Sequence, residues 1–246
     1  MKYLSRNKIY EKIEPFKNAK KIYLFCEGDK EVNYFKFFQG FASNIDIIPI
    51  PNDNGKSDPI KLKENSEILF FGNETVSPKF SISKELKDEI WFVIDTYRWN
   101  EGDKINALKA YTEERNEDYQ GWFVVQSNPS FELWLYYHFH SEKPQVEEVS
   151  KSTSFKEYVD LKIKGGFDNR SMPLEIQKAM LIAEANFENH YGQPTLYSTE
   201  VFNLAKQIIR FTKSQLDLCL EDLKKSPAGN IKKSRRKSAL INNIEL

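Results

Sequence analysis

Residues 22–31, IYLFCEGDKE, decide the fold that we expect for this chain. The first half of the stretch is almost wholly apolar, as in a strand that is buried on both faces of a parallel sheet. Three carboxylates follow at once, Glu27, Asp29 and Glu31, and the next segment, EVNYFKFFQGF, repeats aromatic residues at helical spacing. The stretch therefore predicts a strand, an acidic turn and a helix.

Two later segments repeat this arrangement. DEIWFVID, residues 88–95, predicts a buried strand that ends in Asp95, and a helix is expected at 103–116. A further strand at 122–126 leads through a polar turn into another helix. Strands that alternate with helices predict an α/β fold with a mainly parallel central sheet flanked by helices. Shorter apolar runs lie at 45–51 and 66–72, of which the second is ambiguous.

The chain changes character after residue 140. We expect an α/β domain over residues 20–140, a helical C-terminal portion over 141–225 packed on it, and flanking segments at 1–19 and 226–246. A length of 246 residues favours one domain with additional elements at one end. The helices expected in the C-terminal portion are 151–163, 173–191 and 199–225.

Charge and hydropathy limit the classes of partner. The 36 basic and 36 acidic residues cancel, so any nucleic-acid surface must be local, as in the basic run KKSRRKS at 232–238. No apolar run reaches the roughly 18 residues of a membrane span, and the first residues lack the apolar core of a signal peptide. We therefore expect a cytoplasmic protein without a membrane partner. Its two cysteines, Cys26 and Cys219, are expected to be reduced core residues.

The acidic residues at strand ends are the first candidates for a functional site. Ligands of parallel sheets bind at the carboxyl ends of the strands, where Glu27 and Asp95 would meet if their strands are neighbours. Carboxylates that lie close together require protons or a cation, and Mg²⁺ prefers such oxygen ligands. Either acid could instead cap a helix or lie on the surface.

Three segments carry a resemblance to a known family. LFCEGDKEVNYFKFF (24–38), IWFVIDTYRW (90–99) and SNPSFELWLYYHF (127–139) together resemble the RloB family, bacterial defence proteins with a Toprim-type domain. The third segment is the most specific. KGGFDNRSM and YSTEVFNLAKQI extend the resemblance over roughly residues 20–210. It implies a Toprim-like α/β fold.

The resemblance also implies a set of site residues. Toprim domains hold Mg²⁺ with a glutamate after the first strand and a D-x-D motif after a later strand. Glu27 matches that glutamate, Glu31 matches the second acid of the E-G-x-x-E turn, and Asp95 matches the first aspartate of D-x-D. Glu132, in the N-P-x-F-E-L-W block, is the candidate for the remaining acidic ligand. Its place in a first helical turn would also favour a carboxylate without any ligand.

One position departs from the family pattern. Tyr97 stands where the second aspartate of D-x-D is expected, and a phenol with a pKa of about 10 is a poor Mg²⁺ ligand. Asp103, Glu101 or Glu132 could replace that aspartate, the site could work with one ion, or activity could have been lost.

The first functional hypothesis is a metal-dependent nuclease in antiviral or abortive-infection defence. Mg²⁺ or Mn²⁺ would be held by Glu27, Asp95 and Glu132, with Glu31 assisting and Arg98 stabilising the phosphate charge. The substrate would be DNA or an RNA such as tRNA. The resemblance implies a partner ATPase encoded nearby. The sequence has no G-x-x-x-x-G-K-[ST] loop of its own, so any use of ATP would come from such a partner.

Other hypotheses remain open. The chain could be a catalytically weak interaction module that uses the Toprim scaffold to bind an ATPase, nucleic acid or a phage protein. A polymerase or primase activity ranks last. Further cations that could contact substrate are Lys30, Lys56 and Arg170, and an aromatic surface at Trp99 and Trp122 would allow a homodimer.

Overall fold

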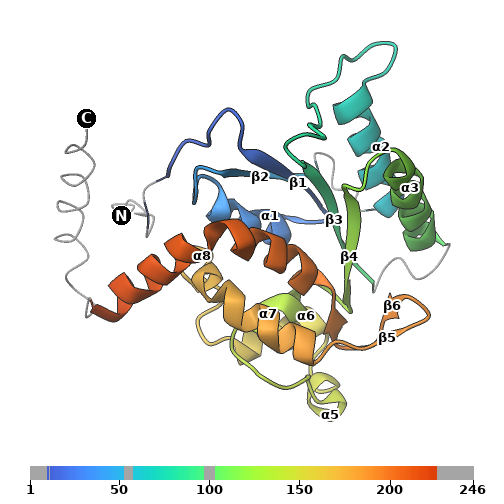
Figure 1. The fold of residues 1–246 in the computed structure, drawn as a ribbon. Coiled ribbons are helices and arrows are strands. Elements are labelled where there is room, and N and C mark those ends of the chain that lie inside the picture. Colours follow the sequence, from blue (N-terminus) through green and yellow to red (C-terminus); the bar gives the residue numbers. More distant parts are fainter. Residues whose placement is uncertain (1–9, 11, 53–57, 97–102, 226–246) are drawn as a thin grey trace, which may run out of the picture.

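A five-stranded sheet forms the centre of the protein (Figure 1). The computed structural model describes residues 10, 12–52, 58–96 and 103–225. Within them the strand order is β2-β1-β3-β4-β7, and the first four of these strands run parallel, whereas β7 pairs antiparallel with β4 at the edge. The bounds are β1 Lys20–Cys26, β2 Ile45–Ile50, β3 Glu89–Asp95, β4 Trp122–Asn128 and β7 Ser198–Thr199. The expected α/β fold with a mainly parallel sheet is confirmed.

Helices cover both faces of the sheet (Figure 1). Side chains of a strand alternate between faces, so Leu24 of β1 packs into one core cluster and Phe25 into the other. The cluster of Phe25 includes α2 (Pro59–Phe71) and α3 (Lys104–Asp118). The larger cluster includes α1 (Asp29–Phe35), the 3₁₀ helix η1 (Lys36–Phe38), α4 (Glu132–Tyr136), α6 (Phe155–Lys162), the 3₁₀ helix η2 (Met172–Glu175), α7 (Ile176–Ala185) and α8 (Val201–Lys225).

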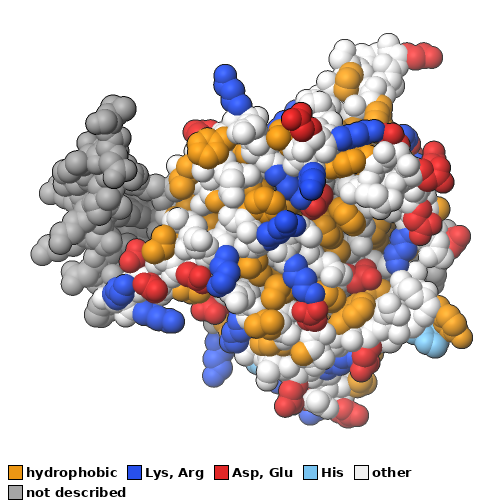
Figure 2. Space-filling view, in the orientation of Figure 1, with side chains coloured by type: hydrophobic (Ala, Val, Ile, Leu, Met, Phe, Trp, Pro, Cys, Tyr) orange, Lys and Arg blue, Asp and Glu red, His pale blue; other side chains and the backbone are white. Residues whose placement is uncertain are grey.

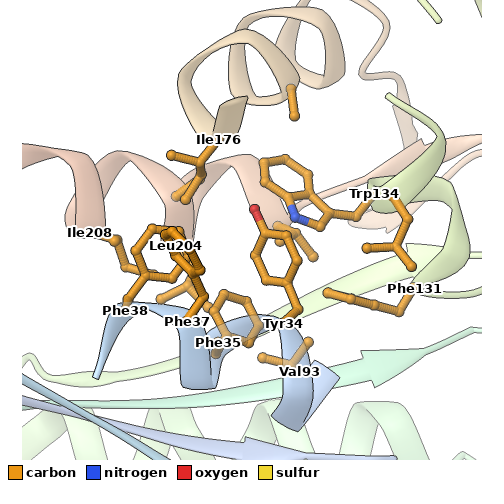
Figure 3. Close-up of a cluster of buried hydrophobic side chains, with 14 of the residues drawn as sticks. Tyr34, Phe35, Phe37, Phe38, Val93, Phe131, Trp134, Ile176, Leu204 and Ile208 are labelled. Atoms are coloured by element: carbon orange, nitrogen blue, oxygen red, sulfur yellow. The ribbon is translucent and has the colours of Figure 1, made fainter. Parts of the chain in front are cut away.

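An aromatic layer joins α1 to the helices of the C-terminal part. Tyr34, Phe35 and Phe38 are fully buried and point from α1 and η1 toward α7 and α8, as Figure 3 shows. Phe131 and Trp134 close the same cluster from the segment after β4, and the ring centroids of Tyr34 and Phe131 lie 5.7 Å apart. Burial of several aromatic side chains at one place fixes the position of α1, and hence of the acidic turn that precedes it.

The remaining elements lie toward the edge of the fold. They are the short helix α5 (Val146–Val149) and the two-stranded hairpin of β5 (Asn189–His190) and β6 (Gln193–Pro194). No helix among the described residues is both long and apolar enough to cross a membrane. Figure 2 shows basic and acidic side chains interspersed on the face that carries α8, in keeping with the net charge of 0.

Several expectations for single segments were wrong. The helix expected at 173–191 ends at Ala185, and the chain then enters the β5–β6 hairpin. Trp122 is buried, 3% exposed, because it faces α2 and α3, so it offers no dimer surface. The run 66–72, which the sequence leaves ambiguous, belongs to helix α2 up to Phe71.

Candidate active site: a buried carboxylate cluster

Three neighbouring parallel strands bring acidic residues to one edge of the sheet. Because β1 pairs with β3 and β3 with β4, Glu27 and Asp95 leave the sheet side by side. The Oε2 atom of Glu27 accepts a hydrogen bond from the backbone N–H of Asp95 at 2.8 Å. Asp95 in turn accepts one at Oδ1 from the backbone N–H of Phe131, also at 2.8 Å, which ties the turn after β4 to the end of β3.

Four carboxylates of this edge are buried. The exposed fractions are 8% for Glu27, 5% for Glu31, 7% for Asp95 and 2% for Glu132. Glu31 lies in the first turn of α1, and Gly28 is the residue just before this helix. The carboxylate of Glu31 lies close to Gly28, because a Cβ added to Gly28 would be 3.1 Å from the Glu31 Oε2 atom. Buried carboxylates are rare unless they are paired or bind a cation, so the cluster needs a physical explanation.

Two of the four acids have strongly raised pKa values. Burial, with repulsion from Glu27 and Glu132, raises the pKa of Glu31 to about 7. Burial, with repulsion from Glu31 and Glu132, raises the pKa of Asp95 to about 8. The cluster therefore holds protons near neutral pH unless a cation replaces them.

Basic side chains surround the carboxylate of Glu132. Its Oε1 atom lies 2.9 Å from the Nζ atom of Lys30 and 3.6 Å from that of Lys156, and Ser130 donates its hydroxyl to Oε2 at 2.7 Å. Burial would raise the pKa of Glu132, but the hydrogen bonds from Ser130 and Lys30 hold it below its usual value. Glu132 is thus ionised at neutral pH.

The family comparison agrees with the sequence resemblance. The family model for RloB-like protein matches residues 22–208, which is about three quarters of the chain. The chain belongs to the RloB-like family. The matched residues of this RloB-like protein run from β1 into α8 and include all four buried carboxylates. No curated protein and no solved structure matches the chain.

The structure of the RloB-like chain brings together four of the predicted site residues, Glu27, Glu31, Asp95 and Glu132. The fifth, Arg98, lies outside the described residues, as do Tyr97, Glu101, Lys56 and Trp99. Asp103, one of the candidates to replace the second aspartate, lies before α3 and accepts a hydrogen bond from Asn106. Arg170 is exposed and forms a bidentate ion pair with Asp168.

Sequence reasoning missed two contacts of Glu132. Ser130 precedes Glu132 by two residues and could have been inferred from that spacing, since a hydroxyl there can reach a carboxylate at the start of a helix. Lys156 comes from α6, beyond a long loop, and no feature of the sequence links it to Glu132.

The donor chemistry of the RloB-like cluster suits a hard divalent cation. Carboxylate oxygens are the ligands that Mg²⁺ and Mn²⁺ prefer, and Glu27, Glu31 and Asp95 supply them in a site where two acids have raised pKa values. In their present positions, no three His, Cys, Asp or Glu side chains of the described residues form a metal-binding group. Side chains of the cluster would therefore have to move to hold an ion.

Proposed function

We propose that this RloB-like chain is a metal-dependent nuclease that hydrolyses phosphodiester bonds of DNA or RNA. The observation that carries the proposal is the convergence of Glu27, Glu31 and Asp95 at one buried edge, with the pKa of Asp95 raised to about 8. Strongly raised pKa values in a cluster of acids are typical of functional sites. A structural role alone would be served better by apolar side chains, because buried like charges are costly.

Glu27, Glu31 and Asp95 are the residues that we propose to hold Mg²⁺ or Mn²⁺. A bound ion of this kind would supply an activated water and neutralise charge on the phosphate. Glu132 was expected among the ligands, but its oxygens already contact Ser130 and two lysines. We therefore propose Glu31 as the third ligand in its place.

Glu132 has a different role in this proposal, which is to position cations. Its carboxylate fixes the ammonium group of Lys30, whose side chain remains 45% exposed, beside the acidic cluster. Lys156, with a side chain that is 53% exposed, approaches the same carboxylate from α6. Two partly exposed ammonium groups beside the buried acids suit the binding of a phosphate backbone.

The biological setting that we propose is antiviral or abortive-infection defence under the control of a partner ATPase. Family membership is compatible with this setting, and the lack of a phosphate-binding loop in the sequence means that any use of ATP requires another protein. Co-purification of the chain with the product of a neighbouring ATPase gene tests the partnership.

Cleavage of plasmid DNA and of total tRNA by the purified chain, in Mg²⁺ and in Mn²⁺, tests the nuclease. We expect Glu27→Ala and Asp95→Ala to abolish cleavage and metal binding measured by calorimetry. Asp118→Ala is the matched control, because this acid is exposed and pairs with Lys84 near the starts of β3 and β4, whereas the cluster lies at the ends of these strands. Cleavage that persists in both cluster variants would refute the assignment.

A second candidate function is an interaction module without catalysis. The ion pair of Lys30 and Glu132 favours it, because a lysine here already supplies the positive charge that a metal would bring. No cleavage by the chain with its ATPase partner present, together with no metal binding in calorimetry, would support the module over the nuclease.

A further inference from the structure

A hollow of about 370 Å³ lies beside α1, away from the strand ends. Its walls come from three places: the N-terminal segment before β1, the face of α1 and η1, and the turn between α6 and η2. The volume is within the range of about 300–1,000 Å³ that is typical of small-molecule sites. The residues that line it are Tyr10, Lys12, Asn33, Lys36, Phe37, Gln39, Asn169 and Arg170.

The N-terminal wall is held in place by specific contacts. The ring of Tyr10 packs edge-on against Phe37 at a centroid distance of 5.2 Å, and the backbone N–H of Ile13 donates to the carbonyl of Gly40 at 2.8 Å. Gly40 has φ +67°, and a Cβ there would lie 2.9 Å from the Ile13 carbonyl and 3.2 Å from the Cβ of Lys12. This close approach fixes Lys12 at the rim.

The opposite wall is equally constrained. Phe167 packs against His138, with ring centroids 5.1 Å apart, and so anchors the turn that carries Asn169 and Arg170. Two N–H groups of the Arg170 guanidinium donate to Asp168 at 2.6 and 2.7 Å, which orients the planar group and uses two of its five donors. The Oδ1 atom of Asn169 is buried without a hydrogen-bond partner among the described residues.

The chemistry of the lining selects a class of ligand. Lys12 and Lys36 meet no carboxylate among the lining residues. Arg170 is paired with Asp168 through Nε and Nη2, and its remaining N–H donors are left for a phosphate. The carboxamides of Asn33, Gln39 and Asn169 offer both donors and acceptors, which is how amide side chains recognise the edge of a base. The aromatic rings give an apolar floor.

We propose that this hollow binds a nucleoside 5′-phosphate. Lys36 and Arg170 bind the phosphate, with Lys12 assisting, and the carboxamides contact the base, so that a donor of the ligand satisfies Asn169 after rotation of its side chain. The nucleotide can be free, or it can be the phosphorylated 5′ end of a strand, since both present the same groups. The site shares α1 with the carboxylate cluster but none of its residues, so it does not depend on the proposed nuclease.

Calorimetric titration of the full chain at low salt tests the proposal with four probes: AMP, inorganic phosphate, adenosine and a 5′-phosphorylated dinucleotide. We expect AMP to bind with a dissociation constant below about 1 mM, and phosphate and adenosine to bind at least about tenfold more weakly. If the dinucleotide binds more tightly than AMP, the source of the ligand is a strand end. If it binds more weakly, the source is a free nucleotide.

Variants assign the binding to this hollow. Lys36→Gln and Arg170→Gln are expected to weaken AMP binding about tenfold or more each, because each removes a charge-assisted contact from an exposed position. Lys213→Gln is the matched control on the exposed face of α8, and Glu27→Ala is expected to bind AMP normally. Equal binding of AMP and phosphate would overturn the proposal. Undiminished AMP binding in Lys36→Gln and Arg170→Gln, or no AMP binding at all, would also overturn it.

Discussion

Replacement of Asp95 by asparagine removes a buried charge and keeps the shape of the side chain. The Oδ1 atom of Asp95 accepts a hydrogen bond from Phe131, and an asparagine oxygen can accept the same bond. Because burial and repulsion from Glu31 and Glu132 raise the pKa of Asp95 to about 8, the folded protein without metal keeps this carboxyl protonated at neutral pH. The unfolded chain ionises the same group near pH 4, at about 3.9.

The size of the effect follows from proton linkage. Between the two pKa values the folded state holds a proton that the unfolded state has lost, so the free energy of unfolding falls by about 1.36 kcal/mol per pH unit. Over the three units from pH 5 to pH 8 this amounts to about 4 kcal/mol as an upper bound. The stability is fully present below about pH 4 and is lost as the pH rises to about 8. When Asp95 is protonated, its charge no longer repels the carboxylate of Glu31. The free-energy difference is therefore calculated for one bound proton and not for two.

Urea denaturation from pH 5 to pH 8, with a chelator present, measures this difference. We expect the wild-type chain to lose more stability over this range than Asp95→Asn, by up to about 4 kcal/mol, so that the variant is the more stable of the two at pH 8. Asp118→Asn, at an exposed ion pair, should follow the wild type. Parallel profiles for the wild type and Asp95→Asn would refute the claim that burial and repulsion hold a proton in the cluster.

Three further predictions concern the same fold. Millimolar Mg²⁺ or Mn²⁺ should raise the midpoint of thermal unfolding at pH 8, because an ion that binds only the folded state stabilises it. Glu27→Ala should lose this increase. An equal increase in the wild type and in Glu27→Ala would exclude the cluster as the site of the ion. Lys30→Gln should lower the free energy of unfolding measured in urea by about 1 kcal/mol, because it leaves Glu132 with only the more distant cation, Lys156. The double variant Lys30→Gln, Glu132→Gln should recover part of this stability. A double variant that is less stable than Lys30→Gln would contradict this reasoning. Gly40→Ala should cost more than the roughly 1 kcal/mol of Gly166→Ala, because both have positive φ but only at Gly40 would the new Cβ meet backbone; equal losses would show that the close approach does not matter.

Much of the sheet could be predicted because burial on both faces leaves a simple pattern. The runs that became β1 and β3 are nearly continuous apolar segments, and each ends in the carboxylate that later proved to be buried. A parallel arrangement then required Glu27 and Asp95 to meet, as the hydrogen bond between the Asp95 backbone and Glu27 confirms. Helix ends were harder to predict: the helix expected to continue to residue 191 ends at Ala185, and Asn189 and His190 form β5 instead.

The lysines beside Glu132 could not be predicted, because their positions depend on tertiary contacts. Lys30 and Lys156 reach this carboxylate from α1 and α6, more than 100 residues apart in sequence. The burial of Trp122 was missed for a similar reason, since a residue at the start of β4 is covered only by helices formed elsewhere in the chain. Local patterns therefore located the acids but not the lysines that keep Glu132 ionised.

The aromatic layer between α1 and α8 has a consequence for biosynthesis. Phe35 and Phe38 leave the ribosome early, whereas Leu204 and Ile208, which cover their cluster in the finished fold, follow roughly 170 residues later (Figure 3). At about 5–20 residues per second, translation of that interval takes on the order of 10–30 s. Throughout that time the aromatic surface of the nascent chain lacks the cover that α8 later provides, and transiently exposed apolar surface of this kind is prone to aggregation.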